Sequence, residues 1–155
     1  MTPAINVTKR SKVEYKIHEY KHNASSESYG LEAADQLNVP EDQVFKTLVV
    51  SLNKHELAVA ILPVSAKLSM KLFAKIIGAK KVEMATQIEV QRSTGYIIGG
   101  VSPIGQKKKL KTIIDSSAKN LATVYISAGK RGLEIELCPI DLKKLTNGLF
   151  ADISK

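Results

Sequence analysis

The chain has 155 residues, of which 44% are hydrophobic and 5% aromatic, and its 23 basic and 15 acidic side chains give a net charge of +8. This length fits one domain with its own core, and the sequence holds neither a run of about 18 apolar residues that would span a membrane nor a signal peptide at its N-terminus. The single cysteine, Cys138, excludes an internal disulfide, so we expect a reducing, cytoplasmic location.

The first third of the chain predicts a strand, a helix and a second strand. Residues 13–20 alternate apolar and polar side chains, as a half-buried strand does. A polar loop is expected at residues 25–28, followed by a helix over 29–37 that Pro40 prevents from continuing. The apolar, β-branched run 44–52 then predicts a buried strand.

The middle of the chain predicts one more strand and two helices. Residues 57–64 are apolar and β-branched, which again indicates a buried strand. Residues 67–77 place apolar side chains at helical spacing, and Gly78 is expected to end that helix. A Thr-x-x-Glu capping-box pattern opens a short helix over residues 86–93.

Three further apolar runs in the last third predict strands at residues 110–114, 123–126 and 133–137. The last run alternates, so we expect its apolar side chains on one face and Glu134 and Glu136 on the other. Pro139 then introduces a short helix that ends near Gly148. Strands outnumber helices without alternating strictly with them, so the fold class is α+β: a single domain over residues 1–155, with a mixed or antiparallel sheet and flanking helices.

A glycine-rich stretch, residues 95–109, carries the strongest functional signal. It contains four glycines and a proline within eleven residues and then three lysines. Gly99 and Gly100 allow backbone N–H groups to approach a ligand, Ser102 adds a hydroxyl, and Pro103 stiffens the turn. The stretch predicts a loop that holds an anionic or carbonyl-bearing ligand; the alternative is an ordinary turn with a basic edge.

Lys46 lies within an otherwise apolar predicted strand, on the face opposite Phe45 and Thr47. Burying an ammonium group is costly unless it meets an anion or hydrogen-bond acceptors. Lys46 is therefore either a cation in a pocket for a phosphate, a ribose hydroxyl or an ester carbonyl, or a lysine at a strand edge that reaches water.

Residues 127–132 form a second loop rich in glycine and positive charge. As a turn it needs no function. As a partner of the Gly99–Gly100 pair, it would close a pocket with Ser127, while Arg131 suits planar recognition of a phosphate.

Positive charge is concentrated in residues 67–81, with five lysines, in 107–111, with four, and in 130–131. Such an excess attracts polyanions and predicts contact with a nucleic acid. The alternative is a solvated basic surface without a partner.

Several chemistries are missing from the sequence. Three scattered histidines, His18, His22 and His55, do not have metal-ligand spacing. Cys138 follows an apolar strand and is expected to be a buried, inert thiol. No nucleophile elbow or Walker-type phosphate loop is present. An enzyme built from this chain would work without a protein nucleophile of these kinds, a metal or a cofactor.

Taken together and in order, these segments resemble the YbaK family of aminoacyl-tRNA deacylases, specifically the Cys-tRNA(Pro) deacylases. The resemblance covers nearly the whole chain and is carried by Thr2-Pro3-Ala4, His18-x-Tyr20-x-His22, Glu32-Ala33-Ala34, Phe45-Lys46-Thr47-Leu48, residues 80–85, residues 94–108 and Lys130-Arg131-Gly132-Leu133. The same fold is known as an editing domain inserted in some prolyl-tRNA synthetases.

The resemblance implies an α+β domain whose mixed sheet curls around a small pocket, with Lys46 as the residue tied to activity. It implies that the substrate's own cysteine thiol attacks its ester carbonyl, so that no metal or cofactor is needed. The substrate-binding residues that we expect are Tyr20, Phe45, Thr47, Gly99, Gly100, Ser102, Pro103, Ser127, Gly129, Lys130 and Arg131.

Two positions differ from the family or vary within it. Ala128 replaces a glycine that many members have, and its methyl group is expected to narrow the pocket or to exclude a positive φ. Glu134 occupies a variable position, and the sequence assigns it no role.

The implied partners are mischarged tRNA(Pro) and prolyl-tRNA synthetase; no sequence pattern indicates an oligomeric state. Two alternatives stay open: an Ala-tRNA(Pro) hydrolase of the same fold, and a non-catalytic module that binds tRNA or a synthetase.

Overall fold

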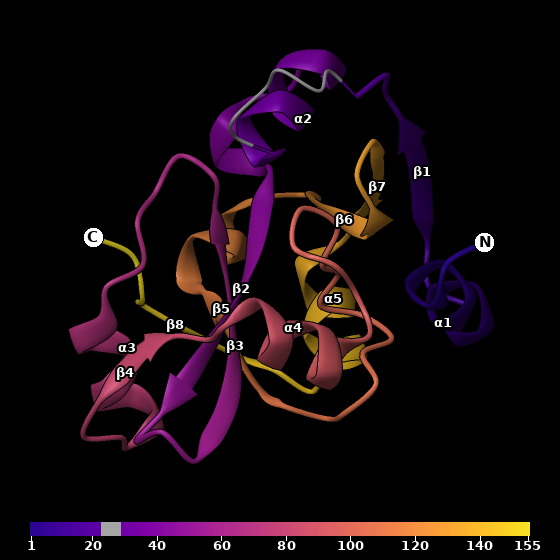
Figure 1. Ribbon diagram of the computed structural model, residues 1–155. Coiled ribbons are helices and arrows are strands. Elements are labelled where there is room, and N and C mark those ends of the chain that lie inside the picture. Colours follow the sequence, from indigo (N-terminus) through magenta and orange to yellow (C-terminus); the bar gives the residue numbers. More distant parts are fainter. Residues whose placement is uncertain (23–28) are drawn as a thin grey trace.

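The computed structural model describes residues 1–22 and 29–155. In this part of the chain the strands form two sheets, an antiparallel one in the order β1-β7-β6 and a mixed one in the order β4-β2-β3-β5-β8 (Figure 1). The strands are β1 (Tyr15–Glu19), β2 (Phe45–Leu52), β3 (Glu56–Pro63), β4 (Val82–Met84), β5 (Lys111–Asp115), β6 (Val124–Lys130), β7 (Leu133–Leu137) and β8 (Leu149–Ala151).

Helices flank both sheets, with α2 beside the start of β2 and α4 in front of the mixed sheet (Figure 1). The helices are α1 (Pro3–Ser11), α2 (Tyr29–Leu37), α3 (Met70–Ile77), α4 (Gln87–Thr94) and α5 (Pro139–Thr146), with 3-10 turns at Glu41–Gln43 and Ser116–Asn120. Within the described residues, none of the helices has the length and apolar character needed to cross a membrane.

Strand β2 is paired along its whole length on one side only. It runs antiparallel to β3 from Phe45 opposite Pro63 to Leu52 opposite Glu56. On its other side β4 pairs only with residues 50–52. In the described part of the chain, the first half of β2 therefore has no strand neighbour on that side.

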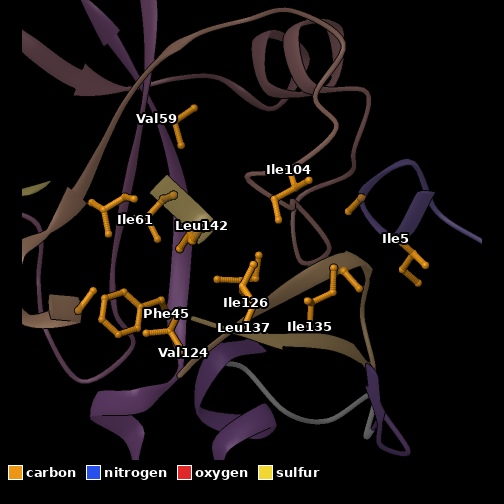
Figure 2. Close-up of a cluster of buried hydrophobic side chains, with 14 of the residues drawn as sticks. Ile5, Phe45, Val59, Ile61, Ile104, Val124, Ile126, Ile135, Leu137 and Leu142 are labelled. Atoms are coloured by element: carbon orange, nitrogen blue, oxygen red, sulfur yellow. The ribbon is translucent and has the colours of Figure 1, made fainter. Parts of the chain in front are cut away.

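The two sheets share one core. Val44, just before β2, forms a parallel bridge with Tyr125 of β6. Figure 2 shows Phe45 of β2 next to Val124 of β6, with Ile126 in the same buried cluster. Burying each such side chain contributes about 1.5–3 kcal/mol, so this cluster fixes how the sheets meet.

Most of the predicted elements are present, and the α+β class with mixed pairing is confirmed. The capping box of α4 is formed, and Gly78 ends α3 in the left-handed conformation. Helix α3 begins at Met70 rather than at residue 67, because Ser69 caps it while Leu68 bridges to Ser154. The polar loop predicted at residues 25–28 lies outside the described residues.

Other expectations need correction. The strands form two sheets rather than one curled sheet. Strand β6 continues to Lys130, so only Arg131 and Gly132 form the turn that was expected over residues 127–132. The short elements α1, β4 and β8 were not predicted; α1 starts where Thr2 caps its first turn and Pro3 opens it. Three-residue strands such as β4 and β8 are too short to show periodicity.

Gly105 gives a test of the packing between α1 and the glycine-rich loop. Gly105 and Gly78 both have positive φ, but a Cβ at Gly105 would lie 2.9 Å from the backbone of Pro3, whereas a Cβ at Gly78 would meet nothing within 4 Å. We expect Gly78→Ala to lower the free energy of unfolding by about 1–2 kcal/mol through backbone strain alone. Gly105→Ala should lose about 1–3 kcal/mol more through overpacking. Urea unfolding of both variants measures the difference; equal losses would contradict this packing.

Candidate functional site

A cavity of about 360 Å³ lies beside the open half of β2. Its walls come from α2, α4, the glycine-rich loop and the β6–β7 hairpin, and its size is within the range of small-molecule sites. The lining residues are Tyr20, Tyr29, Gly30, Val44, Phe45, Lys46, Thr47, Leu48, Val49, Met84, Ala85, Val90, Ile98, Gly99, Val101, Ser127, Arg131 and Glu134.

Lys46 stands half-buried on the open half of β2, in the cavity wall. Its Nζ donates a hydrogen bond of 2.6 Å to the carbonyl oxygen of Ala66. Burial, and then the nearby charge of Lys67, lowers the pKa of the Lys46 ammonium. One acceptor satisfies only part of an ammonium, which has three donors, so this cation retains hydrogen bonds for a ligand.

The neighbouring Thr47 carries a second feature that a ligand would change. Its hydroxyl oxygen is buried and has no hydrogen-bond partner among the described residues. Leaving a buried hydroxyl unsatisfied costs about 1–3 kcal/mol, and a ligand that hydrogen-bonds to this hydroxyl would recover that cost.

Glu134 is the acidic residue among those that line the cavity in the described part of the chain. It lies on the central strand β7, opposite Ser127 of β6 and His18 of β1, and only 6% of it is exposed. Burial raises the pKa of the Glu134 carboxyl to about 8. Burial and the charge of Glu134 also raise the pKa of Tyr20 to about 12. The cavity therefore holds a carboxyl group that gains from a cationic partner.

The sequence assigned Glu134 no role and placed it with Glu136 on the face of the strand opposite the apolar side chains, without showing what covers that face. Alternation identifies the two faces of β7, but it does not show that the second face is covered. Here Glu134 lines the cavity together with Tyr20 and Ser127. One feature could have indicated that Glu134 lies at the site: in the β6–β7 hairpin it pairs with Ser127, which was itself a predicted site residue.

Arg131 is held at the turn of the β6–β7 hairpin by contacts with α2. Its Nε donates to Glu32 Oε1 at 3.3 Å, and its guanidinium carbon lies 4.2 Å from the centre of the Tyr29 ring. The same Glu32 oxygen lies 3.1 Å from Nδ1 of His22. A buried carboxylate and a stacked ring thus orient the guanidinium at the cavity wall.

The glycine-rich loop reaches the cavity at Gly99, which has φ of +100° and whose Cβ would lie 3.1 Å from the Tyr29 ring. Gly100 instead packs against the backbone of Lys130 and Arg131. Ser102 and Pro103, later in the same loop, are buried and do not line the cavity. The Ser102 hydroxyl oxygen accepts a hydrogen bond of 3.2 Å from the backbone N–H of Ile104.

The structure brings together seven of the twelve predicted site residues around the cavity: Tyr20, Phe45, Lys46, Thr47, Gly99, Ser127 and Arg131. The other five do not line it: Gly100, Ser102, Pro103, Gly129 and Lys130. Their functional roles stay predictions.

Three further side chains lie away from this cavity. The methyl group of Ala128 belongs to the buried core cluster, so the expectation that it narrows the pocket is wrong. Cys138 is half-buried at the start of α5, on a separate cavity. His18 is paired with Glu136, at 2.9 Å.

The fold of two sheets flanked by short helices has solved counterparts. A structure described as a putative trans-editing enzyme for prolyl-tRNA synthetase superposes with a TM-score of 0.85 at 24% identity, covering 100% of this chain and 99% of that one. At this identity the likeness establishes the fold.

Sequence comparison identifies the family. The model of the aminoacyl-tRNA editing domain matches residues 27–145. An Enterococcus faecalis protein named "Putative Cys-tRNA(Pro)/Cys-tRNA(Cys) deacylase EbsC" is 40% identical over 156 residues, which cover 99% of this chain and 93% of that protein. A proline–tRNA ligase of Trichlorobacter lovleyi is 27% identical over 99 residues, 64% of this chain but 17% of that enzyme.

The chain belongs to the aminoacyl-tRNA editing domain family. The resemblance stated from the sequence is thereby confirmed, and so is the enzyme class that it implied, an aminoacyl-tRNA deacylase. The substrate class is mischarged tRNA, and the family is related to domains of proline–tRNA ligases.

The burial of Glu134 predicts how stability depends on pH. Its pKa is about 8 in the folded chain against an ordinary 4.5, so between these values the folded state binds a proton that the unfolded state has lost. Stability therefore falls as pH rises through this window. We expect Glu134→Gln to gain stability over the parent between pH 5 and 8, by an amount on the order of a few kcal/mol.

Glu136 gives the matched control on the same strand. There, burial is outweighed by hydrogen bonds from Thr123 and His18, which lower the pKa of Glu136. Glu136→Gln should show no gain as pH rises. Urea unfolding at several pH values measures all three proteins, and parallel curves for the parent and Glu134→Gln would exclude a buried, uncharged carboxyl.

Proposed function

We propose that this protein is a trans-acting deacylase that clears mischarged Cys-tRNA(Pro), acting as a single editing domain over residues 1–155. The observation that supports this most directly is the cavity beside the open half of β2, where Lys46, Glu134 and Gly99 line a space sized for an amino-acid ester. Cysteine is close to proline in size, so a synthetase pocket separates them by only about 1–3 kcal/mol and a second sieve is useful.

The proposed reaction uses a nucleophile that the substrate carries. The cysteine sulfur attacks its own ester carbonyl, a carbon–sulfur bond forms, and the bond to the terminal ribose oxygen breaks. The thiol proton ends on that oxygen, which gives free tRNA and a cyclic thiolactone. In the described part of the chain neither a cysteine nor a histidine lines the cavity, which is compatible with a site that positions rather than attacks.

The protein's contribution is then orientation and charge. Holding a thiol against a carbonyl in attack geometry is worth roughly 7–11 kcal/mol of barrier. Glu134 suits the α-ammonium group of the substrate, because binding a cation there compensates a buried carboxylate. Lys46 binds and orients the 3′-terminal adenosine rather than acting as a base.

The tRNA and protein partners follow from the same proposal. The substrate is tRNA(Pro) charged with the wrong amino acid, and prolyl-tRNA synthetase is the partner that would deliver it. The match to part of a proline–tRNA ligase supports this partnership, since the same domain type is covalently joined to that enzyme.

Removing the amine of Lys46 tests the site. One hydrogen bond to a charged group is worth about 1.5–3 kcal/mol, so Lys46→Ala should lower kcat/KM for Cys-tRNA(Pro) by about tenfold to a hundredfold. Lys9→Ala, an exposed lysine on α1, is the control that removes the same charge and should keep the parent rate. Release of free tRNA under single-turnover conditions is the measurement. If the Lys46→Ala protein kept the parent rate, Lys46 would have no part in binding or orienting the substrate.

Blocking the thiol of the substrate tests the chemistry. S-methylated Cys-tRNA(Pro) should stay intact over the time in which the parent protein clears Cys-tRNA(Pro). A methylated sulfur has no proton to lose, so it cannot form the neutral thiolactone. Release of free tRNA from each substrate gives both rates. Equal cleavage of blocked and free substrates would establish attack by water, and faster cleavage of Ala-tRNA(Pro) would favour the alanine-specific alternative.

A further inference from the structure

The cavity adjoins a segment of the chain in which every charged side chain is basic. Residues 57–82 contain five lysines and no aspartate or glutamate. The segment touches the candidate site directly, because Ala66, whose carbonyl accepts the Lys46 amine at 2.6 Å, immediately precedes Lys67. Lys67 is also close enough for its charge to contribute, after burial, to the lowered pKa of Lys46.

The backbone that carries Lys67 is fixed in place. The carbonyl of Lys67 accepts the N–H of Lys155 at 2.9 Å, and the N–H of Ser69 donates to Ile153 at 2.7 Å. The buried carboxylate of Asp115 in turn accepts the N–H of Ile153 at 3.1 Å. The backbone that carries this cation therefore needs no further ordering when Lys67 binds a ligand.

Helix α3 continues the same charge away from the cavity. Lys71 and Lys75 are four residues apart, so they lie on one face of α3, about 6 Å apart along its axis. Both are exposed, as is Lys67. In residues 1–22 and 29–155 no carboxylate lies within ion-pair distance of these three lysines.

Two other surface lysines have acidic partners. Lys111 lies 3.3 Å from Glu56, and Lys81 lies 4.0 Å from Glu83. The row of Lys67, Lys71 and Lys75 thus combines charge that has no acidic partner in the described residues with a direct chain connection to Ala66, which holds Lys46 in the cavity wall.

We propose that Lys67, Lys71 and Lys75 form the surface that binds the phosphate backbone of the tRNA acceptor stem leading into the cavity. This proposal rests on the proposed function, since it assigns the path of that substrate. Three lysines that neutralise phosphates release condensed counterions, so binding along this row depends steeply on salt and not on base sequence.

The test removes three charges from each of two places. One variant carries Lys67→Gln, Lys71→Gln and Lys75→Gln; the matched control carries Lys107→Gln, Lys108→Gln and Lys109→Gln, three exposed lysines beside the end of α4. The probe is an acceptor-stem RNA minihelix that ends in CCA and carries no amino acid. Fluorescence anisotropy gives its Kd at salt concentrations between about 50 and 200 mM.

We expect the α3 variant to raise Kd at least about tenfold and to reduce the slope of log K against log salt by about 2 to 3, with a much smaller change in the control. In turnover with charged tRNA the α3 variant should raise KM and leave kcat near the parent value. Equal losses in the two variants, a larger loss in the control, or no loss in either would overturn the proposal. A parent protein that binds the minihelix but releases no amino acid would instead overturn the proposed function, so the two failures are distinguishable.

Discussion

The incomplete pairing of β2 is the constraint on which the site depends. Strand β4 pairs with residues 50–52 only, which leaves the first half of β2 as an internal edge. An open edge presents backbone groups and side chains that need cover. Here the cover comes from α2, the glycine-rich loop and the β6–β7 hairpin, none of which forms a strand on β2, and the cavity is the space between them. Lys46 lies on this half of β2, where its side chain lines the cavity.

The two cations at the cavity wall are held in place by other groups of the protein. Arg131 is oriented by Glu32 and stacked on Tyr29, and Lys46 is held by a backbone carbonyl. Glu134 differs, because burial without an ion pair in the described part of the chain leaves it the group whose protonation changes most easily. A site with fixed cations and one adjustable acid can accept an ammonium group without rearranging its walls.

The sequence predicted local features well because they depend on neighbouring residues. The capping box of α4 and the glycine that ends α3 are set within one turn of helix. The burial of Glu134 was not predicted and the role of Ala128 was misjudged, because their surroundings come from distant parts of the chain: Glu134 lines the cavity, and Ala128 belongs to the core. The same limit applies to Gly100, whose freedom from a side chain serves contact with the hairpin backbone.

On the proposed chemistry, the cavity alone does not choose the right tRNA. Glu134 would bind the α-ammonium group and Lys46 the terminal adenosine, and every aminoacyl-tRNA has both. Amino acids that differ by one methyl group are separated by only about 1–3 kcal/mol of binding free energy. Requiring the substrate to supply a thiol separates cysteine from alanine far more sharply than size does. The same requirement is met equally by correctly charged Cys-tRNA(Cys), and lysine contacts to phosphates carry no sequence information. Selection of tRNA(Pro) therefore has to come from a partner that reads the tRNA, and a synthetase that has just mischarged it is the partner that already holds the right one.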